Sequence, residues 1–265
     1  MNNKPTNTQE YTKWLKDRHD IEITGATRAF YESVANKIKA DFESSAIWNQ
    51  LIGNLANYNA EYLLSSGGYH LFEKLEPPKV LIKPFASFLQ KGLRKNVLQN
   101  TNWPDPPSGG WILPENWYSR TVDVVRTLFV VKLLDGSQFF SSKVVNLCDQ
   151  LGLKYSQVFE AREEGYYAIH VYVQQVYEIP KVPFDTEKVT VNTEVQVTTQ
   201  LQEVIRRMLH MYYEHRRTKG ASGEQDLKWQ WDYKSDEFAA NYLGHILHYV
   251  EGMIMEIVEK QKGRL

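Results

Sequence analysis

Two carboxylates near the middle of the chain could hold a metal ion. Asp123 lies in an apolar run over residues 122–134, which predicts a buried strand that closes in a turn at residues 135–136. Glu194 lies in a second stretch, where polar and apolar residues alternate. A carboxylate at the edge of a buried strand has to be paired, hydrogen-bonded or bound to a metal. Taken singly, however, each is an ordinary strand carboxylate.

Three residues before these strands suit a phosphate chain. Lys83, Ser87 and Lys91 are four residues apart, so on a helix they would lie on one face. Pro84 favours the start of a helix here, since proline is tolerated in a first turn. Two ammonium groups and a hydroxyl on one stripe would bind a triphosphate. The alternative is a solvated helix face with a chance serine.

A glycine and two aromatic side chains mark a third segment. Gly165 permits an unusual turn, and Tyr166 beside it offers a flat ring on which a nucleobase could stack. His170 follows at the start of a predicted strand, where a structural histidine is the alternative. In the strand of Glu194, alternation places Gln196 on the same face as the carboxylate. That strand could also be half-exposed, with its polar face in water.

Together, in this order and with these gaps, the four segments resemble the synthetase domain of the RelA/SpoT family over about residues 80–215. Lys83…Ser87…Lys91 is similar to the family's ATP-binding segment, and Asp123 falls where the family has a strand-borne magnesium aspartate. The remaining matches are Gly165-Tyr166…His170 to a Gly-Tyr-x-x-Ile-His motif and Glu194…Thr199 to a Glu-Ile-Gln-x-x-Thr motif.

The resemblance implies an α+β fold, with a nucleotidyltransferase-like mixed sheet flanked by helices and helical N- and C-terminal extensions. It implies a pyrophosphokinase that transfers the β,γ-diphosphate of ATP to the ribose 3′-hydroxyl of GDP or GTP and so makes (p)ppGpp-type alarmones. Asp123 and Glu194 would hold Mg²⁺, and Glu194 would take the hydroxyl proton. The other implied contacts are with phosphate, from Lys83, Ser87, Lys91, Arg126 and Arg162, and with the acceptor, from Tyr166, His170 and Gln196.

The chain departs from the family where arginines would bind phosphate. Leu81, Leu128 and Thr198 stand at positions where many members have arginine, and Arg126 stands where a small residue is usual. The acceptor therefore stays open. One alternative is a toxin that pyrophosphorylates the 3′-CCA end of tRNA, with an antitoxin protein as partner. Another is an inactive nucleotide-binding module.

A tRNA acceptor would need a basic surface. The candidates are two helix faces, which could equally be ordinary solvated faces: Lys91, Arg94 and Lys95, or Arg206, Arg207, Arg216 and Arg217. The formal net charge of −1 excludes a global attraction to nucleic acid.

Hydrophobic patterning predicts one domain over residues 1–265, with a helical region at 1–77, a catalytic α/β core at 78–217 and a helical tail at 218–265. Within it we expect helices over 9–65, a short strand at 80–82, a loop over 100–116 and a helix at 142–151. We also expect strands at 168–177 and 188–199, helices at 201–217 and 237–260, and a polar loop at 218–226. The aromatic tail is a candidate for packing or for contact between copies of the chain.

The single cysteine, Cys148, lies in an apolar run and is expected to be a buried thiol. One cysteine allows no disulfide within the chain, which fits a reducing cytoplasm. The polar N-terminus has no apolar core of a signal peptide, and no apolar run is long enough to span a membrane.

Overall fold

The computed structural model describes residues 4–181, 185–208 and 229–262. The chain forms two compact units. The first contains residues 1–48, 79–127 and 172–194, and the second contains 49–78, 128–171 and 195–265. The chain passes from one unit to the other within β2, β4 and β5. The expected division into a helical region, a core and a helical tail stays a prediction.

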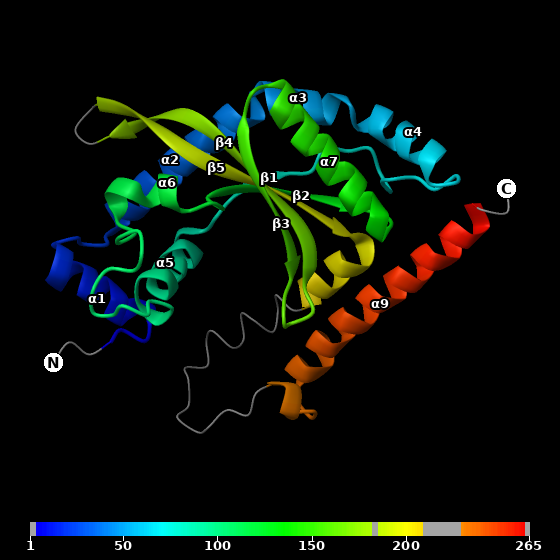
Figure 1. Cartoon of the computed structure of the whole chain (residues 1–265). Coiled ribbons are helices and arrows are strands. Elements are labelled where there is room, and N and C mark those ends of the chain that lie inside the picture. The colour runs from blue at the N-terminus through cyan, green and yellow to red at the C-terminus, as the bar shows by residue number, and fades with distance from the viewer. Residues whose placement is uncertain (1–3, 182–184, 209–228, 263–265) are drawn as a thin grey trace. The chain divides into compact units, whose positions relative to one another are not determined.

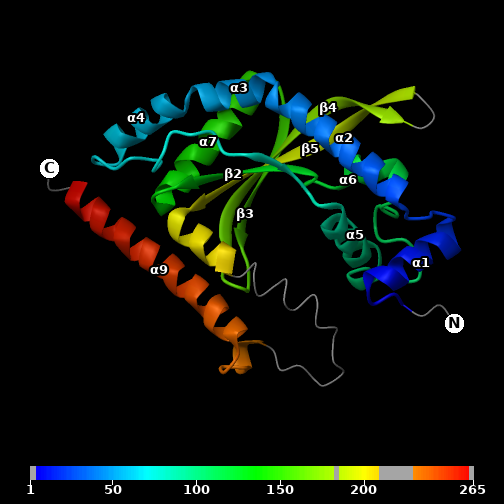
Figure 2. The ribbon, with the colours of Figure 1, turned by 180° about the vertical axis from the view of Figure 1, so that it is seen from behind.

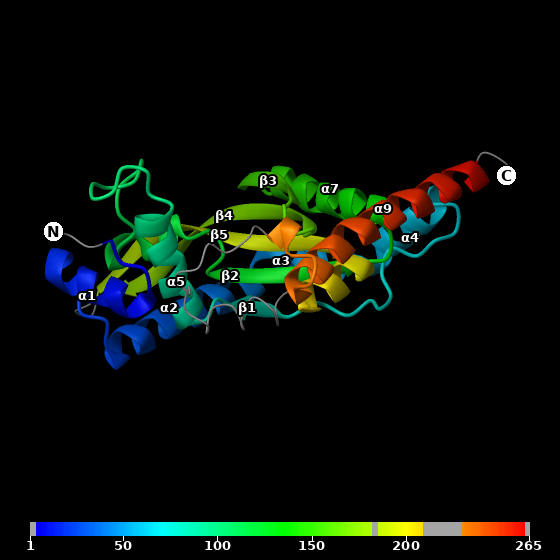
Figure 3. The ribbon, with the colours of Figure 1, turned by 90° about the horizontal axis from the view of Figure 1, so that it is seen from below.

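Five strands form one sheet in the order β1-β2-β5-β4-β3, which can be followed from bottom to top in Figure 3. β1 pairs with β2 in antiparallel register, with Ile82 opposite Val125. Figure 1 shows these strands together with the helices, so the predicted α+β class is confirmed. The strands are β1 (Val80–Ile82), β2 (Val125–Val131), β3 (Lys154–Ala161), β4 (Tyr167–Lys181) and β5 (Asp185–Thr199).

Helices precede and follow the strands, as the pattern predicted. Those of the first unit are α1 (Thr8–His19), α2 (Gly25–Glu43), α5 (Phe85–Leu93), the π-helical turn η1 (Arg94–Leu98) and α6 (Trp117–Arg120). α3 (Ala46–Gly53) has residues in both units, and the second unit contains α4 (Leu55–Ser65), α7 (Leu134–Gln150), a helix that begins at residue 200, and α9 (Asp236–Lys262). Two 3₁₀ turns are η2 (Pro114–Asn116) and η3 (Trp229–Trp231).

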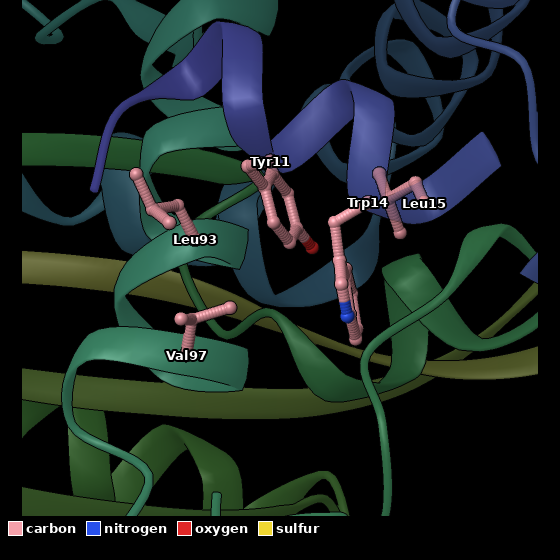
Figure 4. Packing of buried hydrophobic residues seen from close by; sticks show 5 residues of the cluster. All are labelled: Tyr11, Trp14, Leu15, Leu93 and Val97. Carbon is pink, nitrogen blue, oxygen red and sulfur yellow. The ribbon is translucent and has the colours of Figure 1, made fainter. Parts of the chain in front are cut away.

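In the first unit, α1 is packed against α5, the helix that carries Lys91. A buried cluster joins the two elements and η1 through the side chains in Figure 4: Tyr11, Trp14, Leu15, Leu93 and Val97. A Cβ atom at Gly92 would lie 2.9 Å from the Tyr11 hydroxyl oxygen, so a larger residue beside Lys91 would displace the Tyr11 ring of α1. The N-terminal helices, which carry no motif, therefore support α5.

In the second unit, α4 packs against α7 (Figure 2), and this contact corrects one prediction. Asp135 and Gly136 lie in the first turn of α7, which begins at Leu134, rather than forming a turn between strands. The Tyr62 hydroxyl donates to Asp135 at 2.5 Å, and a Cβ at Gly136 would lie 3.0 Å from the Leu71 side chain. Close packing thus makes use of a pair that sequence alone interprets as a turn.

Other boundaries also differ from the predictions. β4 continues to Lys181, beyond the predicted strand end at residue 177. β3 was missed because its mostly exposed residues have no strong apolar pattern. The predicted helix at 201–217 is described only to residue 208, and the polar loop at 218–226 lies outside the described residues. The aromatic tail is not mainly internal packing, since Trp231, Tyr233, Tyr242 and Tyr249 are exposed.

Cys148 is buried as predicted, and burial raises the pKa of its thiol to about 11. Across the described residues, none of the helices combines the length and the apolar character that crossing a membrane requires.

Candidate functional site

A buried ion cluster in the first unit brings together three of the predicted residues. The Asp123 carboxylate accepts from the Lys83 ammonium at 2.8 Å through Oδ2 and from the Lys91 ammonium at 2.7 Å through Oδ1. The side chains are 14, 11 and 17 % exposed for Asp123, Lys83 and Lys91. Both carboxylate oxygens therefore accept hydrogen bonds from cations in a site that is largely shielded from solvent.

The β1–β2 pairing explains why Lys83 meets Asp123. The antiparallel register continues one step beyond Ile82, where the Lys83 amide donates to the Val124 carbonyl at 2.8 Å. The Tyr31 hydroxyl of α2 donates to the Lys83 carbonyl at 3.0 Å. Lys83 is thus fixed through its backbone on both sides, and its side chain reaches the residue that precedes Val124.

Charge compensation decides the ionisation of this cluster. Burial alone would raise the pKa of Asp123, but the ammonium groups of Lys91 and Lys83 outweigh it and lower that pKa to about 2. The pKa of Lys83 is lowered, chiefly by burial and also by the positive charges of Lys91 and Arg126, although its contact with Asp123 raises it. The arrangement therefore keeps the Asp123 carboxylate charged. It also holds the Lys83 and Lys91 ammonium groups where another anion could bind them in place of that carboxylate.

The prediction that Lys83, Ser87 and Lys91 lie on one face of a helix is only partly correct. α5 begins at Phe85 after Pro84, so Lys83 lies before the helix and reaches Asp123 from an extended segment. Ser87 is half-buried in α5, and Arg126 is half-buried in β2 opposite Leu81. Asp123 also lies just outside its strand, because β2 begins at Val125.

Glu194, the second predicted carboxylate, is in β5, the strand next to β2 in the sheet. It is only 4 % exposed, which excludes the half-exposed strand as an explanation of its sequence pattern. Gln196 is half-buried, and Thr198 is buried and donates to the Tyr167 carbonyl at 3.0 Å. Alternation thus identified a strand correctly, but polar residues of β5 are internal.

The second unit brings together the predicted aromatic residues. The Tyr166 hydroxyl and His170 Nε2 are 3.1 Å apart, and the Arg162 guanidinium lies 5.3 Å from the centre of the Tyr166 ring. A tight turn over residues 162–166 holds them, with the Gly165 amide donating to the Arg162 carbonyl at 2.9 Å and φ of +76° at Gly165. His170 is buried, whereas Tyr166 is half-buried.

Sequence reasoning missed Glu160, which completes this group. Its carboxylate accepts from Arg162 Nε at 3.1 Å and lies 3.9 Å from His170 Nδ1. The hydrogen bond from Arg162 is the main cause that lowers the pKa of Glu160. The residue lies in β3, the strand that the pattern did not reveal, so no local signal distinguished it.

The candidate basic surface for a nucleic acid is reduced by ion pairing. Glu203 accepts from Arg206 Nε at 2.5 Å and from Arg207 Nε at 2.8 Å. Arg94 and Lys95 are exposed on η1, while Arg216 and Arg217 lie outside the described residues. Two of the four arginines in the second candidate face therefore share one carboxylate, which offsets one of their two positive charges.

The donor chemistry fits magnesium through two carboxylates rather than through a complete protein site. Over residues 4–181, 185–208 and 229–262, no three histidine, cysteine or acidic side chains are grouped as ligands for a metal ion. Magnesium usually keeps several waters and is held by one or two carboxylates together with substrate phosphates. Asp123 and Glu194 supply oxygen donors of that type.

Comparison with solved structures shows that this is the fold of the small alarmone synthetases. The small alarmone synthetase 1 from Bacillus subtilis covers 90 % of this chain and 97 % of its own, with a TM-score of 0.53 and 13 % identity. The match to the same enzyme bound to its product pppGpp covers 89 % of this chain and 97 % of the enzyme, with a TM-score of 0.51 and 14 % identity. A GTP pyrophosphokinase family protein from Streptococcus pneumoniae covers 91 and 97 %, with a TM-score of 0.52 and 14 % identity.

No protein-family model and no curated protein matches the sequence. The resemblance to the RelA/SpoT synthetase domain is thus confirmed as a likeness of fold over nearly the whole chain.

Proposed function

We propose that this chain is a pyrophosphokinase, which transfers the β,γ-diphosphate of ATP to the ribose 3′-hydroxyl of GDP or GTP. The observation that carries the proposal is the Asp123 carboxylate held between the Lys83 and Lys91 ammonium groups. The shared fold supports it, since one of the similar structures is an alarmone synthetase with its product pppGpp.

The lysines bind the triphosphate of ATP. Phosphate oxygens compete with the Asp123 carboxylate for the two ammonium groups, and charge-assisted hydrogen bonds to phosphate are strong in a mostly buried setting. When the lysines turn to phosphate, the Asp123 carboxylate becomes available to a cation. Ser87 and Arg126 contribute further phosphate contacts, and Arg162 does so from the turn.

Asp123 and Glu194 would hold Mg²⁺ together with phosphate oxygens. The ion would neutralise phosphate charge and favour AMP as the leaving group. Positioning and charge neutralisation are the main requirements of this type of transfer.

Glu194 takes the proton. A carboxylate oxygen of Glu194 removes the proton of the 3′-hydroxyl while the ribose 3′-oxygen forms a bond to the β-phosphorus. The bond between the β-phosphorus and the oxygen that bridges to the α-phosphorus breaks, and AMP leaves with the electron pair. Tyr166 stacks on the acceptor base, and His170 and Gln196 support the acceptor by hydrogen bonding.

Acceptor labelling tests the proposal. ATP labelled at the γ-phosphorus is incubated with the protein and GDP, GTP or bulk tRNA, and AMP release is measured in parallel. We expect label on the guanine nucleotide and an equal amount of AMP. Label on the 3′ end of tRNA would instead identify the toxin activity, and the absence of label and AMP with every acceptor would support the inactive binding module.

Matched variants separate chemistry from folding. Glu194→Gln should lower transfer at least about 100-fold, because it removes a charged group from the reacting centre. Glu187→Gln is the control, since Glu187 lies on the same strand in an ion pair with Lys181. Equal activity of the two variants would contradict the role of Glu194.

A further inference from the structure

The backbone of α9 lies directly against the turn that carries Tyr166. A Cβ atom at Gly165 would lie 2.5 Å from the Asn241 carbonyl oxygen and 3.0 Å from the His245 amide nitrogen. In return, a Cβ atom at Gly244 would lie 2.5 Å from the Gly165 carbonyl oxygen. Because real Cβ contacts are longer than this, the contact requires glycine on both sides.

The residue on the other side of Tyr166 is held by the same helix. The Tyr167 hydroxyl and His245 Nδ1 are 2.8 Å apart, and the Tyr167 ring stacks on His248 with ring centres 3.7 Å apart and an angle of 4°. His245 Nε2 lies 2.9 Å from the Glu163 carbonyl, which can only accept, so Nε2 donates to it and, in the neutral ring, Nδ1 accepts from the tyrosine. α9 therefore contacts the turn at Glu163, Gly165 and Tyr167.

We propose that α9 is a positioning element for the acceptor, with Gly244 and His245 fixing the turn on which Tyr166 is presented. This role rests on the proposed function, since it assumes that Tyr166 stacks on the acceptor base. Tyr166 itself contacts Arg162 and His170, while its two chain neighbours are held by α9. A turn that is ordered before binding loses less conformational freedom when the acceptor arrives, so binding is tighter.

Two glycines of α9 give a matched pair of variants. Gly244→Ala places a methyl group against the Gly165 carbonyl, whereas Gly252→Ala places it in open space, with no atom within 4 Å. Alanine raises the intrinsic helix propensity at both positions. Any difference between the variants therefore reports the contact with the turn rather than a weakened helix.

The kinetic readout is the KM for each substrate. We expect Gly244→Ala to raise the KM for the acceptor about tenfold through misplacement of Tyr166, with the KM for ATP unchanged. Gly252→Ala should match the wild-type chain for both substrates. Tyr167→Phe, which removes only the hydroxyl bound to His245, should raise the acceptor KM about threefold.

Hydrogen exchange supplies a readout that needs no turnover. The Gly165 and Arg162 amides are both hydrogen-bonded within the turn, and they should exchange about tenfold faster in Gly244→Ala but not in Gly252→Ala. Equal exchange in both variants, or faster exchange with an unchanged acceptor KM, would overturn the proposal.

The outcomes also distinguish the two proposals. A wild-type chain that transfers no label to any acceptor overturns the proposed function and the acceptor role of α9 with it. In that case, faster exchange in Gly244→Ala would still identify the contact as structural. An active wild-type chain whose acceptor KM is insensitive to Gly244→Ala overturns the positioning role alone.

Discussion

The cluster of Lys83, Asp123 and Lys91 is held by opposite charges, whereas the turn around Tyr166 is held by backbone contact and ring stacking. Asp123 has two cations within 2.8 Å, and its pKa is lowered to about 2. Glu251, a buried carboxylate on α9, lies 4.0 Å from His248 Nδ1, and burial raises its pKa more than hydrogen bonds with Thr199 and Gln202 lower it. Burial therefore has opposite consequences for the two carboxylates, depending on whether cations accompany it.

Removal of the charge at Asp123 should have the largest effect. Asp123→Asn leaves two ammonium groups close together and mostly buried, which should lower the free energy of unfolding by about 3 kcal/mol. We also expect diphosphate transfer to fall at least about 100-fold. Urea unfolding and the labelling assay measure the two effects.

Asp41→Asn is the control for that variant. Asp41 forms an exposed ion pair with Lys37 in the same unit, so its loss should cost less than about 1 kcal/mol. A loss of stability in Asp41→Asn as large as in Asp123→Asn would show that the buried Asp123 ion pairs contribute no more to stability than an exposed ion pair.

Acid should reduce the contribution of Asp123 to the free energy of unfolding and increase that of Glu251. Asp123 has a folded pKa below its unfolded value, so its contribution of about 2 kcal/mol is present above pH 4 and is lost as the pH falls through about 2. The stability difference between the wild type and Asp123→Asn should therefore shrink over that range. Unfolding of both proteins by urea at several pH values measures it, and a constant difference would contradict the charge compensation.

The contribution of Glu251 to stability changes with pH in the opposite direction. Its folded pKa lies above the unfolded value, so its contribution is present below about pH 4 and is lost as the pH rises through the raised value. Glu251→Gln, whose side chain does not titrate, should thus gain stability relative to the wild type between pH 4 and pH 8. A gain that is the same at both pH values would mean that the buried Glu251 side chain does not titrate differently in the two states.

Truncation of the ring at Tyr166 should have a smaller effect, confined to the acceptor. Tyr166→Ala removes the stacking surface, worth about 1–3 kcal/mol, and should raise the acceptor KM by about 5- to 150-fold. The KM for ATP should not change. If both values rise equally, the residue does not act on the acceptor alone.

The smallest effect is expected when the ring is retained. Tyr166→Phe loses only the hydroxyl that meets His170, so the acceptor KM should rise about fivefold, which corresponds to about 1 kcal/mol. Comparison of the phenylalanine and alanine variants separates stacking from hydrogen bonding. Equal losses in the two would assign the whole contribution to the hydroxyl.

Much of the fold followed from local pattern. Apolar spacing predicted the helices over residues 9–65 and the final helix, and alternation predicted the strands of His170 and Glu194. The errors fall where tertiary contacts override local preference. Asp135 and Gly136 resemble a turn but lie in the first turn of α7, because Tyr62 and Leu71 pack on them.

By itself, the sequence determined the order of the chemical groups: two lysines, an aspartate, a glycine with a tyrosine, and a glutamate. Those types and spacings are local properties, and they sufficed to predict the fold class. Only the tertiary structure decided which groups meet, because strand register and helix packing join residues far apart in the chain. The β1–β2 register brings Lys83 to Asp123, and a helix some 80 residues further along the chain, α9, holds the turn of Tyr166.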